Sequence, residues 1–381
     1  MKTMKKTIII SAFAAALLTT GCVSNEVFSP EEKQVEICFT TPVVGSMTKA
    51  PVYGEISGTT YPIDEDFVIF GVRHPNSYDG WASSNATTYI NGAAFTHDER
   101  YNDDTDGSGG WKGRDSKYYW PMSGVLSFGG YSPASAKKVD SETRGKGTFT
   151  YDAKGLTITG FSVHTTASLQ QDLMYAERVY NKTSNTGTNT TYDGVDIAFK
   201  HALSSIQFKV QLSANYTSTF ELTSIKVGQV KYSGKFTENI TETITNGTIT
   251  SSNAPKWEPA DALLPDSTPY VAFSSESGLE LNNNYKVGST DNYLALDGLT
   301  GQHDLILMPQ TLTGNDEAVI EIVYTVNGTE NKSTVQLNTI SDKWEIGKRY
   351  TYNITLGYDL ILVGATVDPW IENEDNDIPI N

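Results

Sequence analysis

Cysteine is scarce in this chain. Only Cys22 and Cys38 occur among 381 residues. Two cysteine thiols are too few for a zinc site built from thiolates, and they exclude a framework of several disulfides. The stability of the fold must therefore come from packed apolar cores. Because a chain of this length exceeds one comfortable core, two domains are expected.

Basic residues are outnumbered. The chain holds 28 Lys and Arg against 45 Asp and Glu, which gives a formal net charge of -17. Nucleic-acid binding depends on a basic stripe that releases counterions, and no such stripe is present, so nucleic acid is excluded as a partner. An acidic surface of this kind keeps an exported protein soluble and specifies no ligand.

Long apolar runs are missing as well, apart from one of 12 residues, Thr7 to Leu18. A helix that spans a membrane needs about 20 residues. Three lysines precede the run and small residues follow it, an order that predicts a signal peptide over residues 1–21. The sequence Gly21-Cys22 resembles the lipobox of bacterial lipoproteins, which implies cleavage before Cys22 and acyl chains, such as palmitate, on its sulfur. An ordinary cysteine near a plain cleavage site is the alternative interpretation.

Helical periodicity is nearly absent, whereas alternation of apolar and polar residues recurs and predicts strands with one buried face. Asn327-Gly328 predicts a tight hairpin turn after one of these strands, because both residue types accept positive φ. The return strand is expected to carry Val335 and Leu337. The alternating segments are Val35 to Phe39, Ile206 to Leu212, Ile320 to Val326 and Tyr350 to Leu356. Many short strands separated by turn residues are typical of all-β sandwiches.

A polar stretch from Asn181 to Gly194 separates two strand-rich halves. It marks either a domain boundary or a long loop inside one domain. With the boundary placed there, the organisation is a signal peptide at 1–21, an N-terminal propeptide with the first strand at 22–49, an N-terminal domain at 50–194 and a C-terminal domain at 195–381.

Catalytic and cofactor motifs are not found, so neither an enzyme nor a bound cofactor is expected. No phosphate-cradling glycine loop, dinucleotide fingerprint or serine elbow occurs, and the five histidines are scattered. Residues 102–107 have the oxygen ligands of a calcium loop, but Gly113 stands at the twelfth position, where such a loop has glutamate. An acidic turn is therefore preferred and no metal site is expected. Two options stay open: a carboxylate pair that meets only in space, and exposed aromatic rings that stack on sugars.

Five segments, in this order, resemble the fimbrillin family of Bacteroidetes pilus subunits. They are Tyr118-Tyr119-Trp120-Pro121, Asp172-Leu173-Met174-Tyr175-Ala176, Phe199-Lys200-His201-Ala202-Leu203, Leu307-Met308-Pro309-Gln310 and the stretch from Trp344 to Trp370. His201 is interpreted as a position at the start of a strand whose ring satisfies a local hydrogen bond. The resemblance implies two transthyretin-like β-sandwich domains in tandem, and a lipoprotein precursor that is polymerised at the cell surface and supports adhesion.

The resemblance also implies assembly by strand exchange with other pilin subunits. A trypsin-like protease would cut after Lys49, before Ala50, in a loop of small residues, with Arg73 as the next basic site. The first strand, Gln34 to Val44, would then leave, and a neighbour's strand would take its place.

The donor strand is expected near the C-terminus. The candidate is the run with Leu360, Leu362, Val363 and Val367; it is either the donor or a core strand that leaves Ile371 to Asn381 as a tail. The sequence does not distinguish a shaft, tip or anchor subunit, and it names neither the protease nor the ligand. The alternative function is a monomeric, lipid-anchored surface protein that binds glycan or a host protein.

Overall fold

The computed structural model describes residues 35–40, 42–49, 57–76, 79–98, 110–137, 147–184, 194–214, 216–289, 293–357 and 361–370. Within these ranges the chain forms strands and no α-helix, so the predicted all-β class is confirmed. Helical structure is limited to short 3-10 turns. These turns are Ala134–Lys137, Ala167–Leu169, Asn283–Tyr285 and Leu337–Thr339.

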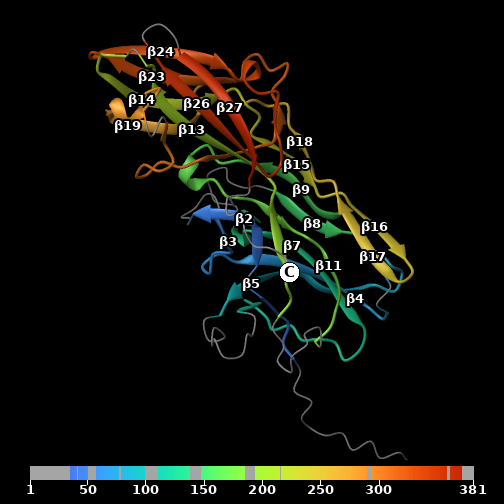
Figure 1. Ribbon diagram of the computed structural model, residues 1–381. Coiled ribbons are helices and arrows are strands. Elements are labelled where there is room, and N and C mark those ends of the chain that lie inside the picture. The colour runs from blue at the N-terminus through green and yellow to red at the C-terminus, as the bar shows by residue number, and fades with distance from the viewer. Residues whose placement is uncertain are drawn as a thin grey trace, which may run out of the picture. The chain divides into compact units, whose positions relative to one another are not determined.

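The first sheet has ten strands, which come from residues 38 to 201 of the chain. Figure 1 labels several of them, including β2, β3, β4, β5 and β7. The order of the sheet is β1-β6-β5-β4-β7-β10-β12-β2-β3, with β11 paired to β7. The strands are β1 Cys38–Phe39, β2 Val43–Lys49, β3 Ser57–Thr60, β4 Phe67–His74, β5 Thr87–His97, β6 Trp111–Gly113, β7 Val125–Ser132, β10 Met174–Ala176, β11 Val179–Lys182 and β12 Ala198–His201.

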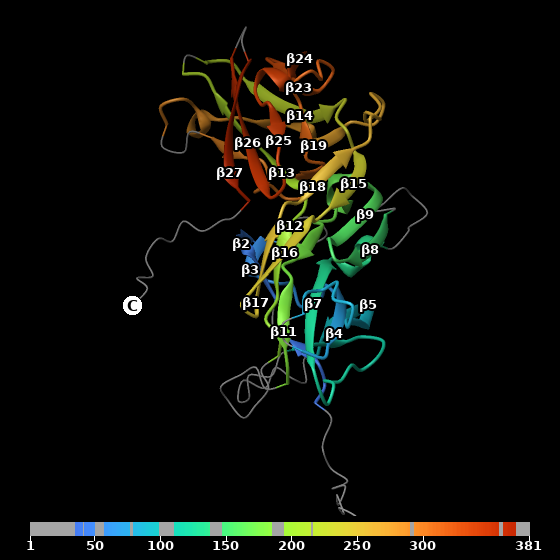
Figure 2. The same cartoon turned by 90° about the vertical axis from the view of Figure 1, so that its right-hand side faces the viewer.

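A second sheet crosses the expected domain boundary. Its order is β18-β15-β9-β8, so strands from before and after residue 194 pair with one another. A two-stranded hairpin, β16–β17, follows β15, and Figure 2 shows it beside the first sheet. The strands are β8 Thr148–Asp152, β9 Gly155–Ser162, β15 Ser233–Thr237, β16 Ile240–Thr245, β17 Thr248–Asn253 and β18 Lys256–Pro259. The boundary at residue 194 stays a prediction.

Two further sheets contain the C-terminal strands. One has the order β20-β13-β26-β27, with β21 paired to β13, and the other has the order β19-β14-β23-β24, while β22 pairs with β25 alone. The strands are β13 Ser204–Leu212, β14 Phe220–Gly228, β19 Tyr270–Glu280, β20 Leu294–Ala295, β21 Leu305–Leu307, β22 Gln310–Thr311, β23 Val319–Val326, β24 Thr329–Gln336, β25 Lys343–Trp344, β26 Lys348–Leu356 and β27 Ile361–Pro369.

The hairpin between β23 and β24 confirms the predicted turn. Asn327 and Gly328 have φ of 49° and 79°, the left-handed region that a two-residue hairpin turn requires. The return strand ends one residue earlier than expected. Val335 lies in β24, but Leu337 begins a 3-10 turn and is fully buried there.

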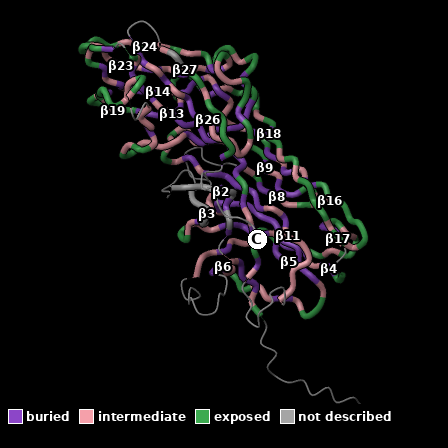
Figure 3. The backbone as a smooth tube through the Cα atoms, in the orientation of Figure 1, coloured by how far each residue is buried: buried purple, intermediate pink, exposed green. Residues whose placement is uncertain are grey.

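Buried side chains form two apolar clusters. The larger includes alternate residues of β13, β26, β14 and β23, among them Phe208, Tyr352, Leu222 and Ile320. The smaller is rich in aromatic rings, lies on the first sheet and includes Phe39 of β1. Figure 3 shows that buried residues follow the strands of the sheets, whereas the β16–β17 hairpin is largely exposed.

Candidate functional site: a seated N-terminal strand

Residues 35–40 are held as a strand along one edge by the segment at 118–120. The Ile37 amide donates to the Tyr118 carbonyl at 2.7 Å, and the Trp120 amide donates to the Val35 carbonyl at 2.9 Å. Beyond this point β1 pairs antiparallel with β6, with Cys38 opposite Lys112. This edge therefore consists of two short pieces of chain.

The opposite edge is held at Val195. The Thr40 amide donates to the Val195 carbonyl at 3.1 Å, and the Val195 amide donates to the Cys38 carbonyl at 2.9 Å. The Thr40 hydroxyl also donates to the Asp196 carboxylate at 2.9 Å. Residues 35–40 therefore have backbone partners on both sides, although β1 is the terminal strand in the order of the first sheet and its contact at Val195 is a single bridge.

The side chains of this strand fill the smaller core. Ile37 and Phe39 have no exposed surface. The Phe39 ring makes edge-to-face contacts with Phe95 and Phe128 at centroid distances of 4.9 and 5.4 Å. Burial of such a side chain contributes about 1.5–3 kcal/mol, so these two together stabilise the seated strand by roughly 3–6 kcal/mol. Removal of the strand would expose this trough and two rows of backbone groups.

The chain after the seated strand differs from the expectation. The expected strand from Gln34 to Val44 is divided into β1 and β2, and Gln34 lies outside the described residues. The prediction of a loop at Ser46 to Lys49 is also wrong, because these residues belong to β2. Lys49 is paired with Ser57 in β3. β2 gains a second partner in β12, which runs parallel to it. The sequence did not predict this strand, because apolar and polar residues do not alternate between Ser46 and Lys49.

The other predicted processing sites are placed as follows. Lys49 is the last residue of β2, while Ala50 and Cys22 lie outside the described residues, as does the acidic loop at 102–107. Arg73 lies inside β4, which is paired on both sides with β5 and β7. Its guanidinium also donates to the Ser123 carbonyl and hydroxyl, both at 3.0 Å.

The donor-strand candidate coincides largely with β27. This strand is the last in its sheet and pairs antiparallel with β26 over its whole length. Val363 packs against the larger core, and Val367 is 51% exposed. Leu362 belongs to β27, and Leu360 lies outside the described residues.

A clasp of three side chains, Trp370, His201 and Asp172, closes the end of β27. The rings of Trp370 and His201 stack at 3.9 Å with an interplanar angle of 10°. The ring of His201 makes a hydrogen bond as predicted, but the bond is not local, because Nδ1 lies 2.8 and 3.0 Å from the two oxygens of Asp172, 29 residues away in sequence. His201 is the last residue of β12 and not the start of a strand. All three residues are at most 4% exposed, so the histidine ring is not open to a substrate.

The segments that carry the family resemblance meet in space. Tyr118 to Trp120 hold the seated strand, and β10, from the second segment, pairs with β12, from the third. Gln310, from the fourth, uses its side-chain amide to bind both the amide and the carbonyl of Lys231. These residues therefore connect segments that are far apart in sequence, and we call such positions joints.

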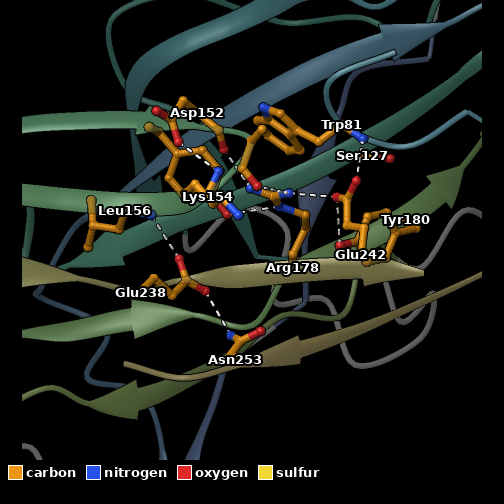
Figure 4. A network of polar contacts seen from close by, with 12 residues as sticks. Trp81, Ser127, Asp152, Lys154, Leu156, Arg178, Tyr180, Glu238, Glu242 and Asn253 are labelled. Carbon is orange, nitrogen blue, oxygen red and sulfur yellow. Dashed lines mark hydrogen bonds and ion pairs between the residues drawn. The ribbon is translucent and has the colours of Figure 1, made fainter. Parts of the chain in front are cut away.

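Sequence reasoning missed a buried ionic network centred on Arg178 (Figure 4). The side chain of Arg178 has no exposed surface, and its Nη1 lies 2.6 Å from Oε1 of Glu242 in β16. Its guanidinium also lies 4.2 Å from the centre of the Trp81 ring and donates to the carbonyls of Asp152 and Ala153. This network fastens the β16–β17 hairpin to the first sheet. No local pattern announces it, since Arg178 and Glu242 are 64 residues apart in sequence.

A second buried carboxyl group, Glu238, lies beside the Arg178 network (Figure 4). It accepts a hydrogen bond from the Leu156 amide at 2.9 Å and another from the Asn253 side chain at 2.8 Å. Burial raises the pKa of Glu238 to about 7, because the charged form is poorly solvated there. The group therefore titrates near neutral pH.

Searches for a metal site and a membrane span give no candidate within the described ranges. No group of three or more histidine, cysteine, aspartate or glutamate side chains is arranged to hold a metal ion in that part of the chain. No helix in it is long and apolar enough to cross a membrane.

Comparison with protein-family models identifies one family. The fimbrillin-like family model matches residues 78–370, more than three quarters of the chain. A comparison with curated protein sequences finds no match.

Solved structures include several that are similar to this chain over most of its length. A fimbrial protein from Bacteroides vulgatus is similar over 87% of this chain and 99% of its own, with 16% identity and a TM-score of 0.52. A candidate cell adhesion protein from Bacteroides uniformis covers 88% and 99%, with 15% identity and a TM-score of 0.49. The tip fimbrial protein Mfa3 from Porphyromonas gingivalis covers 81% and 94%, with 10% identity and a TM-score of 0.33. The chain belongs to the fimbrillin-like family.

Proposed function

We propose that this protein is a fimbrial subunit that is exported as a lipoprotein precursor and assembled at the outer surface by protease-triggered strand exchange. One observation carries the proposal: residues 35–40 precede Lys49, have backbone partners on both sides and fill an apolar trough. A cut after Lys49 leaves this strand attached only by non-covalent contacts. Once it leaves, the trough presents backbone groups that only another strand can satisfy.

The position of Lys49 favours it over Arg73 as the cleavage site. Lys49 is the terminal residue of its strand, whereas Arg73 is an interior residue of β4 with partners on both sides. A protease binds its substrate as an extended segment with free backbone groups, and the backbone of β4 is already paired on both sides. Ala50 would then be the first residue of the mature subunit, and Cys22 would anchor the precursor to the outer membrane.

We further propose that the subunit contains two transthyretin-like sandwiches in tandem. Support comes from the C-terminal sheets, β20-β13-β26-β27 and β19-β14-β23-β24, whose alternate side chains join one apolar cluster as the two faces of a sandwich do. The donor strand is taken from the C-terminal part of a neighbouring subunit, either the β27 run or the tail at 371–381.

N-terminal sequencing of protein recovered from the cell surface tests the proposal, together with an unboiled gel that preserves polymers. The expected result is a start at Ala50 and a ladder of polymers. A Lys49→Ala variant should keep the precursor start and lose the ladder, whereas the matched Arg73→Ala variant should not. A lipidated Cys22 start with a single monomer band would overturn strand exchange and indicate a monomeric anchored protein.

Glycan binding is a second candidate function, and one cavity favours it. This cavity, of about 590 Å³, is lined by the rings of Phe70 and Tyr118 beside Asn91, Arg114 and Asp115. Aromatic faces next to planar polar groups suit a sugar ring. A glycan array with the purified protein tests this idea, and an absence of binding that persists for the assembled fibre would contradict it.

A further inference from the structure

Glu36 is the only charged residue between Val35 and Thr40. Its carboxylate lies 4.0 Å from Nζ of Lys112 and 3.7 Å from Nζ of Lys117. The side chains of Glu36 and Lys112 are only 16% and 13% exposed, so this charge pair is shielded in part from water. The seat of the strand is therefore cationic at one defined position, immediately before the buried Ile37.

A cavity of about 530 Å³ adjoins this position. Its charged lining consists of three cations and three carboxylates, with His97 as a further titratable group. They are Lys112, Lys117 and Arg114, and Glu36, Asp98 and Asp115. Arg114 is bound by Asp66 and Asp115, so it keeps these partners when the first strand leaves. Release of that strand takes Glu36 away from Lys112 and Lys117, which favours an incoming strand with an acidic residue at the position of Glu36.

On the basis of the proposed strand exchange, we propose that Lys112 and Lys117 bind a carboxylate of the incoming strand. Residues 377–381 of a second copy form that strand, and Asp377 supplies the carboxylate. The seated strand has the sequence Glu36-Ile37-Cys38-Phe39-Thr40. An acidic residue comes first, apolar side chains stand at the second and fourth positions with a small residue between them, and a side chain that can donate a hydrogen bond comes last. The segment Asp377-Ile378-Pro379-Ile380-Asn381 repeats that order. Proline at the third position keeps the carbonyl to which the Val195 amide donates in the present structure.

Only one register satisfies the tail. Ile378 and Ile380 are the only pair of apolar residues at alternate positions in the segment 371–381. A slip by one residue would place the charge of Asp377 in the site of Ile37, which has no exposed surface. Burial of a charge without a partner is far more costly than loss of a surface pair, so the apolar sites and the lysines select the same register.

The run from Asp359 to Val363 offers a similar order of acidic and apolar residues. However, the strand Ile361–Pro369 pairs with β26 through nine residue pairs, and Trp370 is held by His201 at its end. Donation by that run would break these contacts, whereas donation by residues 377–381 breaks none of them. The tail is therefore the better occupant.

Peptide binding tests the proposal with protein that has been cut after Lys49. The probes are a peptide of residues 374–381 and the same peptide with Asp377→Lys. The unchanged peptide should bind about 1.5- to fivefold more tightly, which is the range for partly exposed ion pairs. In a Lys112→Glu and Lys117→Glu double variant the preference should reverse. A Lys256→Glu and Lys343→Glu variant, with the same change in net charge, should behave like the wild type.

The outcomes separate the two proposals. Equal binding of both peptides to all three proteins would overturn the role of the lysines while leaving strand exchange intact. Tighter binding of a peptide of residues 359–367 would overturn the choice of occupant. If neither peptide binds and the cut protein stays monomeric, strand exchange itself is wrong. A Glu36→Lys change in the double variant should restore the stability of its precursor, which shows that the variant still folds.

Discussion

Replacement of Arg178 by alanine should release the β16–β17 hairpin from the first sheet. The change removes a side chain with no exposed surface and leaves the Glu242 carboxylate, only 15% exposed, without its cation. The carbonyls of Asp152 and Ala153 lose a donor at the same time. Loss of one partner from a buried ion pair typically costs about 3–5 kcal/mol.

Hydrogen exchange read by mass spectrometry suits this prediction because it reports each segment separately. Exchange in residues 240–253 should rise by about two orders of magnitude or more in Arg178→Ala, since each 1.4 kcal/mol of lost stability is a factor of ten in opening. Lys226→Ala is the matched control. Its pair with Glu321, at 3.6 Å, is about one third exposed, so a loss of at most about 1 kcal/mol is expected.

A double variant separates the charge from the packing. With Arg178→Met and Glu242→Gln together, no buried charge is left alone, so much of the lost protection should return. Unchanged exchange of the hairpin in Arg178→Ala would refute the reasoning, as would equal effects of the Arg178 and Lys226 changes.

Three further predictions concern single sites. Glu238 has a folded pKa of about 7, above its usual 4.5, so its contribution to stability is complete below pH 4.5 and is lost as pH rises through 7. Urea unfolding at pH 5 and pH 8 should show a loss of up to about 3 kcal/mol that Glu238→Gln abolishes; a parallel loss in that variant would contradict it. Phe39→Ala should cost about 3–5 kcal/mol in urea and speed the release of the cut strand, measured as the rate of peptide uptake. Trp370→Ala should raise hydrogen exchange in β27 but not in β24, and equal exchange would show that the clasp does not hold the strand.

The strands with strict alternation were predictable because their signal is local. Ile206 to Leu212, Ile320 to Val326 and Tyr350 to Leu356 all lie in strands, and the positive φ values of Asn327 and Gly328 follow from their residue types. The trough could be anticipated in outline as well, since Ile37 and Phe39 alternate with polar residues. Alternation identifies a buried face but not the strand that lies beside it.

Partners across the sheets were not predictable for that reason. β15 pairs with β9 although about 70 residues separate them, and β2 pairs with β12 in parallel. The Arg178 network has the same origin. An arginine just before β11 and a glutamate in β16 look like ordinary surface residues until the fold brings the hairpin against the first sheet. Their burial is a property of the tertiary fold and not of either segment.

The family segments explain why a resemblance was visible when the geometry was not. A residue in a regular strand can exchange with other apolar residues at small cost, provided that volume and patterning are kept. A residue at a joint has less freedom, because it satisfies a hydrogen bond and a packing contact at once. Asp172 binds His201, and His201 carries Trp370, so a change in any one leaves a buried polar group or a cavity. We therefore expect sequence similarity in such a family to persist at joints while the strands between them diverge.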